Sequence, residues 1–177
     1  MEKSKHQRWA ERLCSRREVC SQELRFKLKA QGAEVEEIER LIAALTQNNF
    51  LNEARYAHAF VHDKSRLQGW GMEKIRYALR AKQIPEASIR KALEEIDPNA
   101  QRERLRHLLE AKHRQLEAKQ RPHEATQRPH EVTQRPHEAK QRPLEATQRL
   151  LAAKLIRYGL SRGFAYEEVA EVVNHLD

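Results

Sequence analysis

The sequence has few of the residues that interrupt helices: of its 177 residues, 5 are glycine and 6 are proline, and four of those prolines fall in one unusual segment. It also lacks the alternation of Val, Ile, Thr and aromatic residues that is typical of β-strands. Helix-favouring Ala, Leu, Glu, Lys, Arg and Gln are abundant instead. The composition therefore predicts an all-α protein.

Cysteine and long apolar runs are scarce as well. Cys14 and Cys20 are the two cysteines, and their spacing fits neither a Cys-x-x-Cys redox pair nor a zinc site, so we expect reduced thiols. No segment approaches the roughly 18 apolar residues that span a bilayer, and the residues after Met1 lack the apolar centre of a signal peptide. We therefore expect a cytoplasmic protein.

Charge, in contrast, is abundant. Charged residues make up 34% of the chain, and its formal net charge is +8 at pH 7. A positive excess of this size favours a polyanion or an acidic protein surface as the partner. A highly charged helical protein without such a partner fits the composition equally well.

Internal repetition is the main feature of the sequence. Three segments, starting at Ser21, Met72 and Ala152, share one apolar frame of helix, short turn and helix. Gly32 and Gly163 are expected to end the middle helices. The equivalent positions are Leu24, Ile75 and Leu155; Ile38, Ile89 and Val169; Ile42, Leu93 and Val173; Leu45, Ile96 and Leu176; and, in the turn, Ala33, Ile84 and Phe164.

A further helix is expected before each copy: residues 3–14, residues 52–67 with Tyr56, Phe60 and Leu67 on one face, and a helix opened by Asp97-Pro98. One helical hairpin has too little apolar surface to stand alone, whereas stacked repeats bury a continuous seam. The sequence thus predicts three tandem three-helix repeats, at 1–48, 49–97 and 98–177.

A heptad array interrupts the third repeat at about residues 117–147. Residues 117–144 read EAKQRPH EATQRPH EVTQRPH EAKQRPL, which places Pro122, Pro129, Pro136 and Pro143 seven residues apart. Proline inside a helix costs about 3 kcal/mol, so a mostly disordered spacer is favoured over kinked helices joined by extended pieces. His123, His130 and His137 are too widely spaced to converge on one ion, and no metal is expected.

Charge is distributed unevenly between the helices of each copy. The middle helices are basic and the last helices are acidic. With Ile75 buried, Arg76 and Arg80 share one flank of their helix and Lys74 takes the other. This pattern predicts a basic binding face, although helices that simply expose their charges to solvent, with opposite faces attracting each other between neighbouring repeats, would give the same pattern.

Catalysis is not expected. The sequence offers no Ser-His-Asp or Cys-His set, phosphate-binding glycine loop or paired carboxylates, and no cofactor is implied. His58 and His62 are spaced for one helix face, but the segment HAFVH lacks the glutamate of a metalloprotease motif.

The segment from Phe50 to Ile84 resembles the central signature of the RecX family of regulatory proteins. The matching features are Arg55-Tyr56, Phe60, the basic Lys64 and Arg66, the turn Gly69-Trp70-Gly71 and the pair Ile75-Arg76. SRREVCSQEL (15–24) resembles the opening motif of the family and LSRGFAYEEV (160–169) its closing motif, while Asn52-Glu53 replaces a more usual pair of aspartates and the heptad array is foreign to the pattern.

This resemblance implies an elongated, curved array of repeats with a basic face. It also implies a monomer that binds the RecA–single-stranded-DNA filament and inhibits ATP hydrolysis and strand exchange in recombination, DNA repair and the SOS response. Contacts with single- or double-stranded DNA through the basic face are a further implication. The contact residues carried over by position are Arg16, Arg17, Arg25, Arg55, Lys64, Arg66, Trp70, Lys74, Arg76 and Arg80.

Two other functions fit parts of the pattern. Middle helix, turn and last helix imitate a DNA-binding helix-turn-helix, but the would-be recognition helices, EVEEIERL and YEEVAEVV, are acidic and suited poorly to a DNA groove. A helical-repeat scaffold for another acidic protein is the second alternative.

Overall fold

The structure is a computed structural model that describes residues 4–120 and 138–176, and every regular element in these ranges is a helix. The all-α prediction is therefore confirmed for the described residues. The chain divides into two compact units: unit 1 comprises Met1–Gln68 and Met72–Asp97, and unit 2 comprises Gly69–Gly71 and Pro98–Asp177. The histidines His123, His130 and His137 lie outside the described residues.

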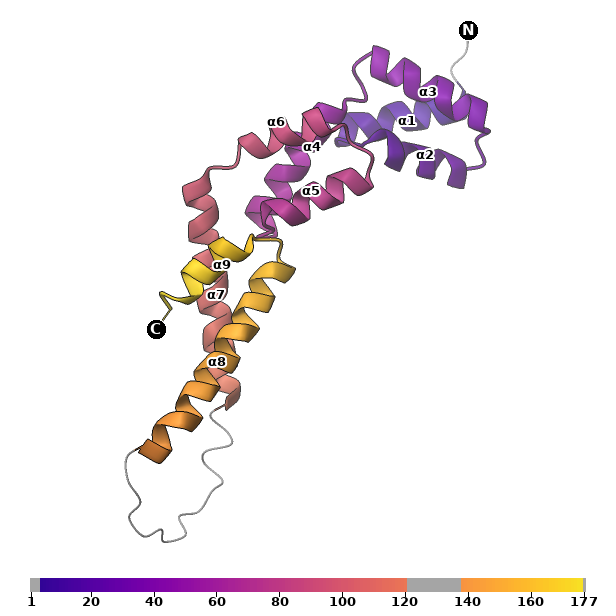
Figure 1. The fold of residues 1–177 in the computed structure, drawn as a ribbon. Helices are drawn as coiled ribbons and strands as arrows, with labels where there is room; N and C mark the ends of the chain where they lie inside the picture. Colours follow the sequence, from indigo (N-terminus) through magenta and orange to yellow (C-terminus); the bar gives the residue numbers. More distant parts are fainter. Residues whose placement is uncertain (1–3, 121–137, 177) are drawn as a thin grey trace. The chain divides into compact units, whose positions relative to one another are not determined.

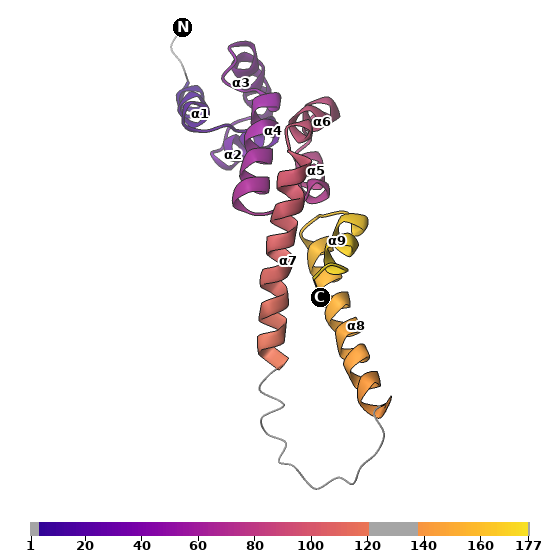
Figure 2. The same cartoon turned by 90° about the vertical axis from the view of Figure 1, so that its left-hand side faces the viewer.

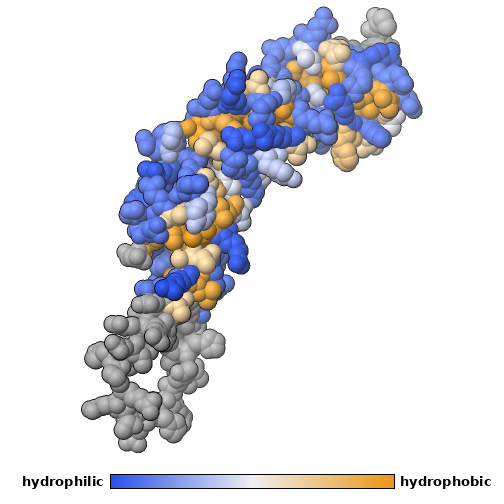
Figure 3. Space-filling model, in the orientation of Figure 1, coloured by the Kyte–Doolittle hydropathy of each residue, from blue (hydrophilic) through white to orange (hydrophobic). Residues whose placement is uncertain are grey.

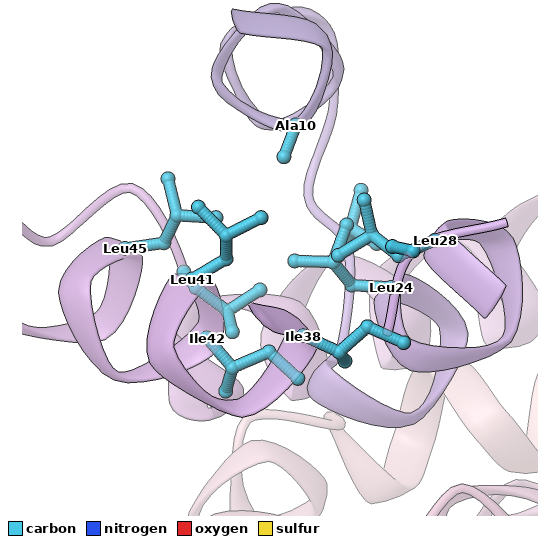
Figure 4. Packing of buried hydrophobic residues seen from close by; sticks show 10 residues of the cluster. Ala10, Leu24, Leu28, Ile38, Leu41, Ile42 and Leu45 are labelled. Carbon is cyan, nitrogen blue, oxygen red and sulfur yellow. The ribbon is translucent and has the colours of Figure 1, made fainter. Parts of the chain in front are cut away.

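Unit 1 begins with three helices around one apolar core: α1 (Lys5–Arg16), α2 (Ser21–Ala30) and α3 (Val35–Gln47). Ser4 caps α1, because its hydroxyl accepts a hydrogen bond from the Gln7 amide. Figure 4 shows side chains from all three helices converging on this core. Its labelled members are Ala10, Leu24, Leu28, Ile38, Leu41, Ile42 and Leu45.

The second group of helices in unit 1 is α4 (Glu53–His62), α5 (Met72–Ala81) and α6 (Glu86–Glu94). A π-helical turn, η1 (Asp63–Leu67), directly follows α4. Asn52 caps α4 through its side-chain oxygen. Tyr56, Ile75, Leu79, Ile89 and Leu93 are among the buried side chains.

Unit 2 consists of the Gly69–Gly71 turn and the helices α7 (Pro98–Gln120), α8 (Glu138–Ser161) and α9 (Tyr166–Val173). Figures 1 and 2 show α7 and α8 as its long helices, with the short α9 beside them. α7 packs against both α8 and α9, so the first helix of the third repeat remains joined to the other two. Leu105, Leu109, Leu155, Phe164 and Val169 form the centre of its core.

The repeated frame is present in all three copies. Each middle helix ends in the same turn, in which the amide of the buried apolar residue bonds to a carbonyl five residues earlier: Ala33 to Leu28, Ile84 to Leu79 and Phe164 to Gly159. The aligned positions at the start of the frame, Leu24, Ile75 and Leu155, are all buried. The periodicity therefore identified these three core positions correctly, while Leu176, which it aligned with Leu45 and Ile96, is only partly buried.

Leu67 corrects one of the sequence predictions. It was expected on the apolar face with Tyr56 and Phe60, yet it is 77% exposed, whereas Ser65 is buried. The π-turn explains the difference: η1 holds an extra residue per turn, closed by a bond from the Gln68 amide to the Asp63 carbonyl. The extra residue rotates Leu67 away from the core.

The heptad array is the second correction. Residues 117–120 end α7 and residues 138–147 begin α8, with Pro143 inside the helix. A disordered spacer is therefore the wrong description of these residues, while residues 121–137 lie outside the described part. The later part of α8 is anchored by Leu155, and extending an anchored helix needs no new nucleation. That extension offsets the hydrogen bond lost at Pro143.

Gln83 offers a test of the repeated turn. It has φ +59° at the position that is Gly32 (φ +81°) and Gly163 (φ +87°) in the other copies. A residue other than glycine in the left-handed conformation is strained by about 1 kcal/mol, which substitution by glycine would relieve. Part of that relief is offset because glycine makes the unfolded state more flexible. We expect Gln83→Gly to stabilise the protein by about 0.5 kcal/mol in urea denaturation. A Gln83→Gly variant that is less stable would contradict the strain.

No helix among the described residues is long and apolar enough to cross a membrane.

Candidate partner-binding surface

The predicted contacts of the first helices lie on α2 and at the end of α1. Arg16 ends α1 and is exposed, and no ion pair of Arg16 is present among the described residues. Arg17 instead pairs with Glu23 at the start of α2. Arg25 reaches from α2 to α3, where its Nε and Nη2 donate to the two carboxylate oxygens of Glu39 at 2.7 and 3.0 Å. This bidentate bond holds the pKa of Glu39 below its usual value.

The predicted contacts on α5 have a similar environment. Arg80 donates to both oxygens of Glu86, the first residue of α6, at 2.9 and 2.8 Å, and this bond lowers the pKa of Glu86. Arg76 donates to Glu73 one turn earlier at 2.6 Å. Both arginines are on the surface, with Arg80 the more exposed. The guanidinium groups of the middle helices thus lie next to carboxylates, which come from the same helix at Arg76 and from the last helix at Arg25 and Arg80.

These ion pairs bear on the two interpretations of the charge pattern. Arg25–Glu39 and Arg80–Glu86 each join a basic middle helix to the acidic last helix that follows it, so the attraction acts within a group of helices rather than between neighbouring groups. Solvent-exposed pairs contribute about 0–1 kcal/mol each. A partner that offers its own carboxylates or phosphates in better geometry can therefore replace Glu39 or Glu86 at small cost.

The guanidinium group of Arg55 makes several hydrogen bonds within unit 1. Its Nε donates to Glu18 at 2.9 Å, and its Nη1 and Nη2 both donate to the Asn49 carbonyl at 3.0 Å. Asn49 has φ +57°, so this guanidinium closes a left-handed turn between α3 and α4. The geometry assigns Arg55 a structural role in addition to any contact with a partner.

The other predicted contacts lie, in chain order, on α4's π-helical continuation η1, in the glycine turn of unit 2 and at the start of α5. Lys64 lies over the Phe60 ring, 5.3 Å from its centroid, and donates to Gln68 at 3.2 Å. Arg66 is exposed on η1, Lys74 lies in the first turn of α5 and Trp70 is half-buried. All ten residues remain predicted contacts, of which only some share a helix.

The Gly69–Trp70–Gly71 turn is positioned by backbone contacts within unit 2. The Gly71 amide donates to the Arg162 carbonyl at 2.9 Å. A Cβ at Gly71 would lie 2.2 Å from the Gly163 carbonyl oxygen, and Gly69 has φ +61°. Both glycines are thus required by the geometry that places Trp70.

Sequence reasoning missed two kinds of residue on this surface. The first are the carboxylates that pair with the arginines, above all Glu39 and Glu86. The second are apolar side chains left in solvent, including Phe26 and Tyr77, which are each 77% exposed and occupy equivalent positions on α2 and α5. The exposed aromatic residues could have been found by aligning the repeats, because Phe26 and Tyr77 occupy the same aligned position and that position is outside the apolar frame.

Comparison with known proteins gives consistent matches. Residues 52–93 match the family described as "RecX, second three-helix domain". A protein named "Regulatory protein RecX" from Prosthecochloris aestuarii is 38% identical over 85 residues, which cover 48% of this chain and 56% of that protein. One of the same name from Pseudomonas fluorescens is 41% identical over 83 residues, covering 47% and 53%. The chain thus spans about half the length of the curated relatives it matches.

Solved structures extend the likeness over almost the whole chain. The crystal structure of RecX from Lactobacillus salivarius superposes with a TM-score of 0.70, covering 98% of this chain and 95% of that one at 18% identity. Another RecX crystal structure gives 0.70 over 96% of this chain at 20% identity. At such identities the likeness establishes the fold.

Proposed function

We propose that the chain is a RecX-family regulator, as its match over residues 52–93 indicates, and that it binds the RecA–single-stranded-DNA filament and inhibits its ATPase and strand-exchange activities in recombination and DNA repair. The proposal describes a cytoplasmic regulator that is not an enzyme and acts as a monomer without a cofactor. Its partner is the recombinase, with DNA contacts through the basic middle helices.

The match over residues 52–93 is the observation that carries this proposal. It contains seven of the ten predicted contact residues, including Arg76 and Arg80 on the outer surface of α5. A net charge of +8 supports approach to a filament of DNA and protein. The acidic helices α3 and α9 occupy the recognition position of a helix-turn-helix, so sequence-specific reading of DNA is disfavoured.

Repetition suggests how inhibition would work. A filament presents equivalent protomers in series, and a chain with repeated helical groups meets more than one of them. Contacts with adjacent protomers would hold them in one state and oppose the changes of ATP turnover. Affinity should fall as salt is raised, because phosphates or acidic side chains are contacted.

The direct test is an ATPase assay on preformed recombinase–single-stranded-DNA filaments. We expect the wild-type chain to lower the steady-state rate at fewer than one molecule per protomer, since each bound chain restrains several protomers. Co-sedimentation with the same filaments would show binding at the concentrations that inhibit. Full ATPase activity at every ratio of protein to recombinase would overturn the proposed regulation.

A further inference from the structure

Exposed apolar side chains gather at one equivalent place, the junction of the middle and last helices. Of the eight large hydrophobic residues found exposed in the described chain, five lie there: Phe26, Val35, Tyr77, Leu160 and Tyr166. Phe26 and Tyr77 are equivalent, and Val35 and Tyr166 each begin a last helix. Single exposed apolar residues are ordinary, but recurrence at corresponding positions indicates a surface that is used.

In the first repeat this junction forms a groove. A hollow of about 280 Å³ lies between α2 and α3, with Phe26 and Val35 as its walls and the buried Ile38 as its floor. Figure 3 shows apolar surface interrupting the hydrophilic surface over these first helices. The rim is polar, formed by Lys29 and by the Arg25–Glu39 pair.

The second repeat shows that the fold does not require such a groove. The positions equivalent to Lys29 and Val35 are Arg80 and Glu86, whose ion pair joins α5 to α6. Helix, turn and helix are formed equally well with this polar closure. The apolar walls of the first repeat are therefore a property of its own residues.

We propose that the groove between α2 and α3 receives an apolar side chain of the recombinase, presented next to a carboxylate. This inference rests on the proposed function for the identity of the partner. An aromatic wall and a buried apolar floor inside a polar rim are the usual surroundings of an anchoring residue between proteins.

Charge indicates which residue accompanies the anchor. Lys29 lines the rim, and no ion pair of Lys29 is present among the described residues, so it is placed to meet a carboxylate of the partner. A nucleic-acid strand fits less well, because it brings a row of phosphates to a rim whose other charges, Arg25 and Glu39, are already paired, whereas a single carboxylate matches Lys29 alone. The observations thus favour a protein segment over a stacked nucleobase.

The test measures binding of full-length variants to preformed recombinase–single-stranded-DNA filaments by co-sedimentation. Phe26→Ala and Val35→Ser change residues that are 77% and 62% exposed, so an unchanged Tm is expected. Each should weaken binding about tenfold, as loss of an interface anchor does. Leu150→Ala, which removes an exposed apolar side chain from α8, should bind like the wild type.

Lys29 provides an independent arm of the same experiment. Lys29→Glu should weaken filament binding, and Lys29→Arg should preserve it, because only the sign of the charge matters to a partner carboxylate. The same variants are titrated with single-stranded DNA alone. An equal loss of binding to naked DNA would overturn the protein occupant and indicate base stacking instead.

The outcomes separate the two proposals. A wild-type chain that fails to sediment with filaments contradicts the proposed function itself. A wild-type chain that binds while Phe26→Ala and Val35→Ser bind equally well contradicts only the groove.

Discussion

Replacing Gly71 by alanine is expected to destabilise the protein by about 3 kcal/mol, at the upper end of the cost of overpacking. The added Cβ would lie 2.2 Å from the Gly163 oxygen, 2.3 Å from the Gly163 carbon and 2.5 Å from the Phe164 nitrogen. All three are backbone atoms, which cannot rotate away as a side chain would. The backbone at Gly71 or at Gly163 must therefore move, and the hydrogen bond from the Gly71 amide to the Arg162 carbonyl is then lost.

Urea denaturation of the full chain measures this effect, and Gly32→Ala is the matched control. Gly32 has no atom within 4 Å of an added Cβ, but its φ is +81°. Alanine there meets only the left-handed backbone penalty of about 1 kcal/mol. An equal loss of unfolding free energy in the two variants would show that the close backbone approach at Gly71 adds nothing to the cost of the alanine side chain.

The apolar frame was predictable because burial imposes a period on the sequence. Leu24, Ile75 and Leu155 recur with the same spacing from their partners in each copy, and all three are buried. Gly32 and Gly163 likewise predicted the ends of α2 and α8, because a helix often ends at a residue with positive φ, which favours glycine. Signals of this kind depend on local conformation and on one buried face, both of which a single sequence records.

The π-turn and the helical ends of the heptad array left no comparable signal. Asp63–Leu67 contains neither glycine nor proline, so no residue in it marks the extra residue per turn. Pro143 argued against a helix on local grounds, yet α8 includes it because anchoring further along the helix outweighs one lost bond. At Pro143, packing therefore overrode the local preference of the residue.

Pairing of charges was the least predictable property of the candidate surface. The sequence shows a basic α2 and an acidic α3, but which carboxylate reaches Arg25 depends on how the two helices cross. The same holds for Arg80 and Glu86 across the turn between α5 and α6. Counting charges along the sequence therefore predicted which helices are basic, but not which carboxylate pairs with each arginine.

Reversing the charge at Arg76 and Arg80 together should weaken filament binding by about a hundredfold at low salt. The reason is that removing one partner of a charge pair that is buried in an interface costs about 2–5 kcal/mol of binding free energy. The double change Arg76→Glu and Arg80→Glu leaves both side chains near Glu73 and Glu86, where like charges now repel. Co-sedimentation across a salt series is the measurement. The deficit should shrink as salt is raised, because screening weakens every exposed charge contact.

The matched variant, Glu73→Gln with Glu86→Gln, breaks the same two ion pairs but leaves both guanidinium groups in place. If the arginines bind the recombinase filament, this variant should bind more tightly than the wild type, because no carboxylate competes for the guanidinium groups. If the pairs serve only to stabilise α5 and its contact with α6, both double variants should bind more weakly. The sign of the change in affinity therefore decides whether α5 presents its arginines to a partner or uses them within the fold.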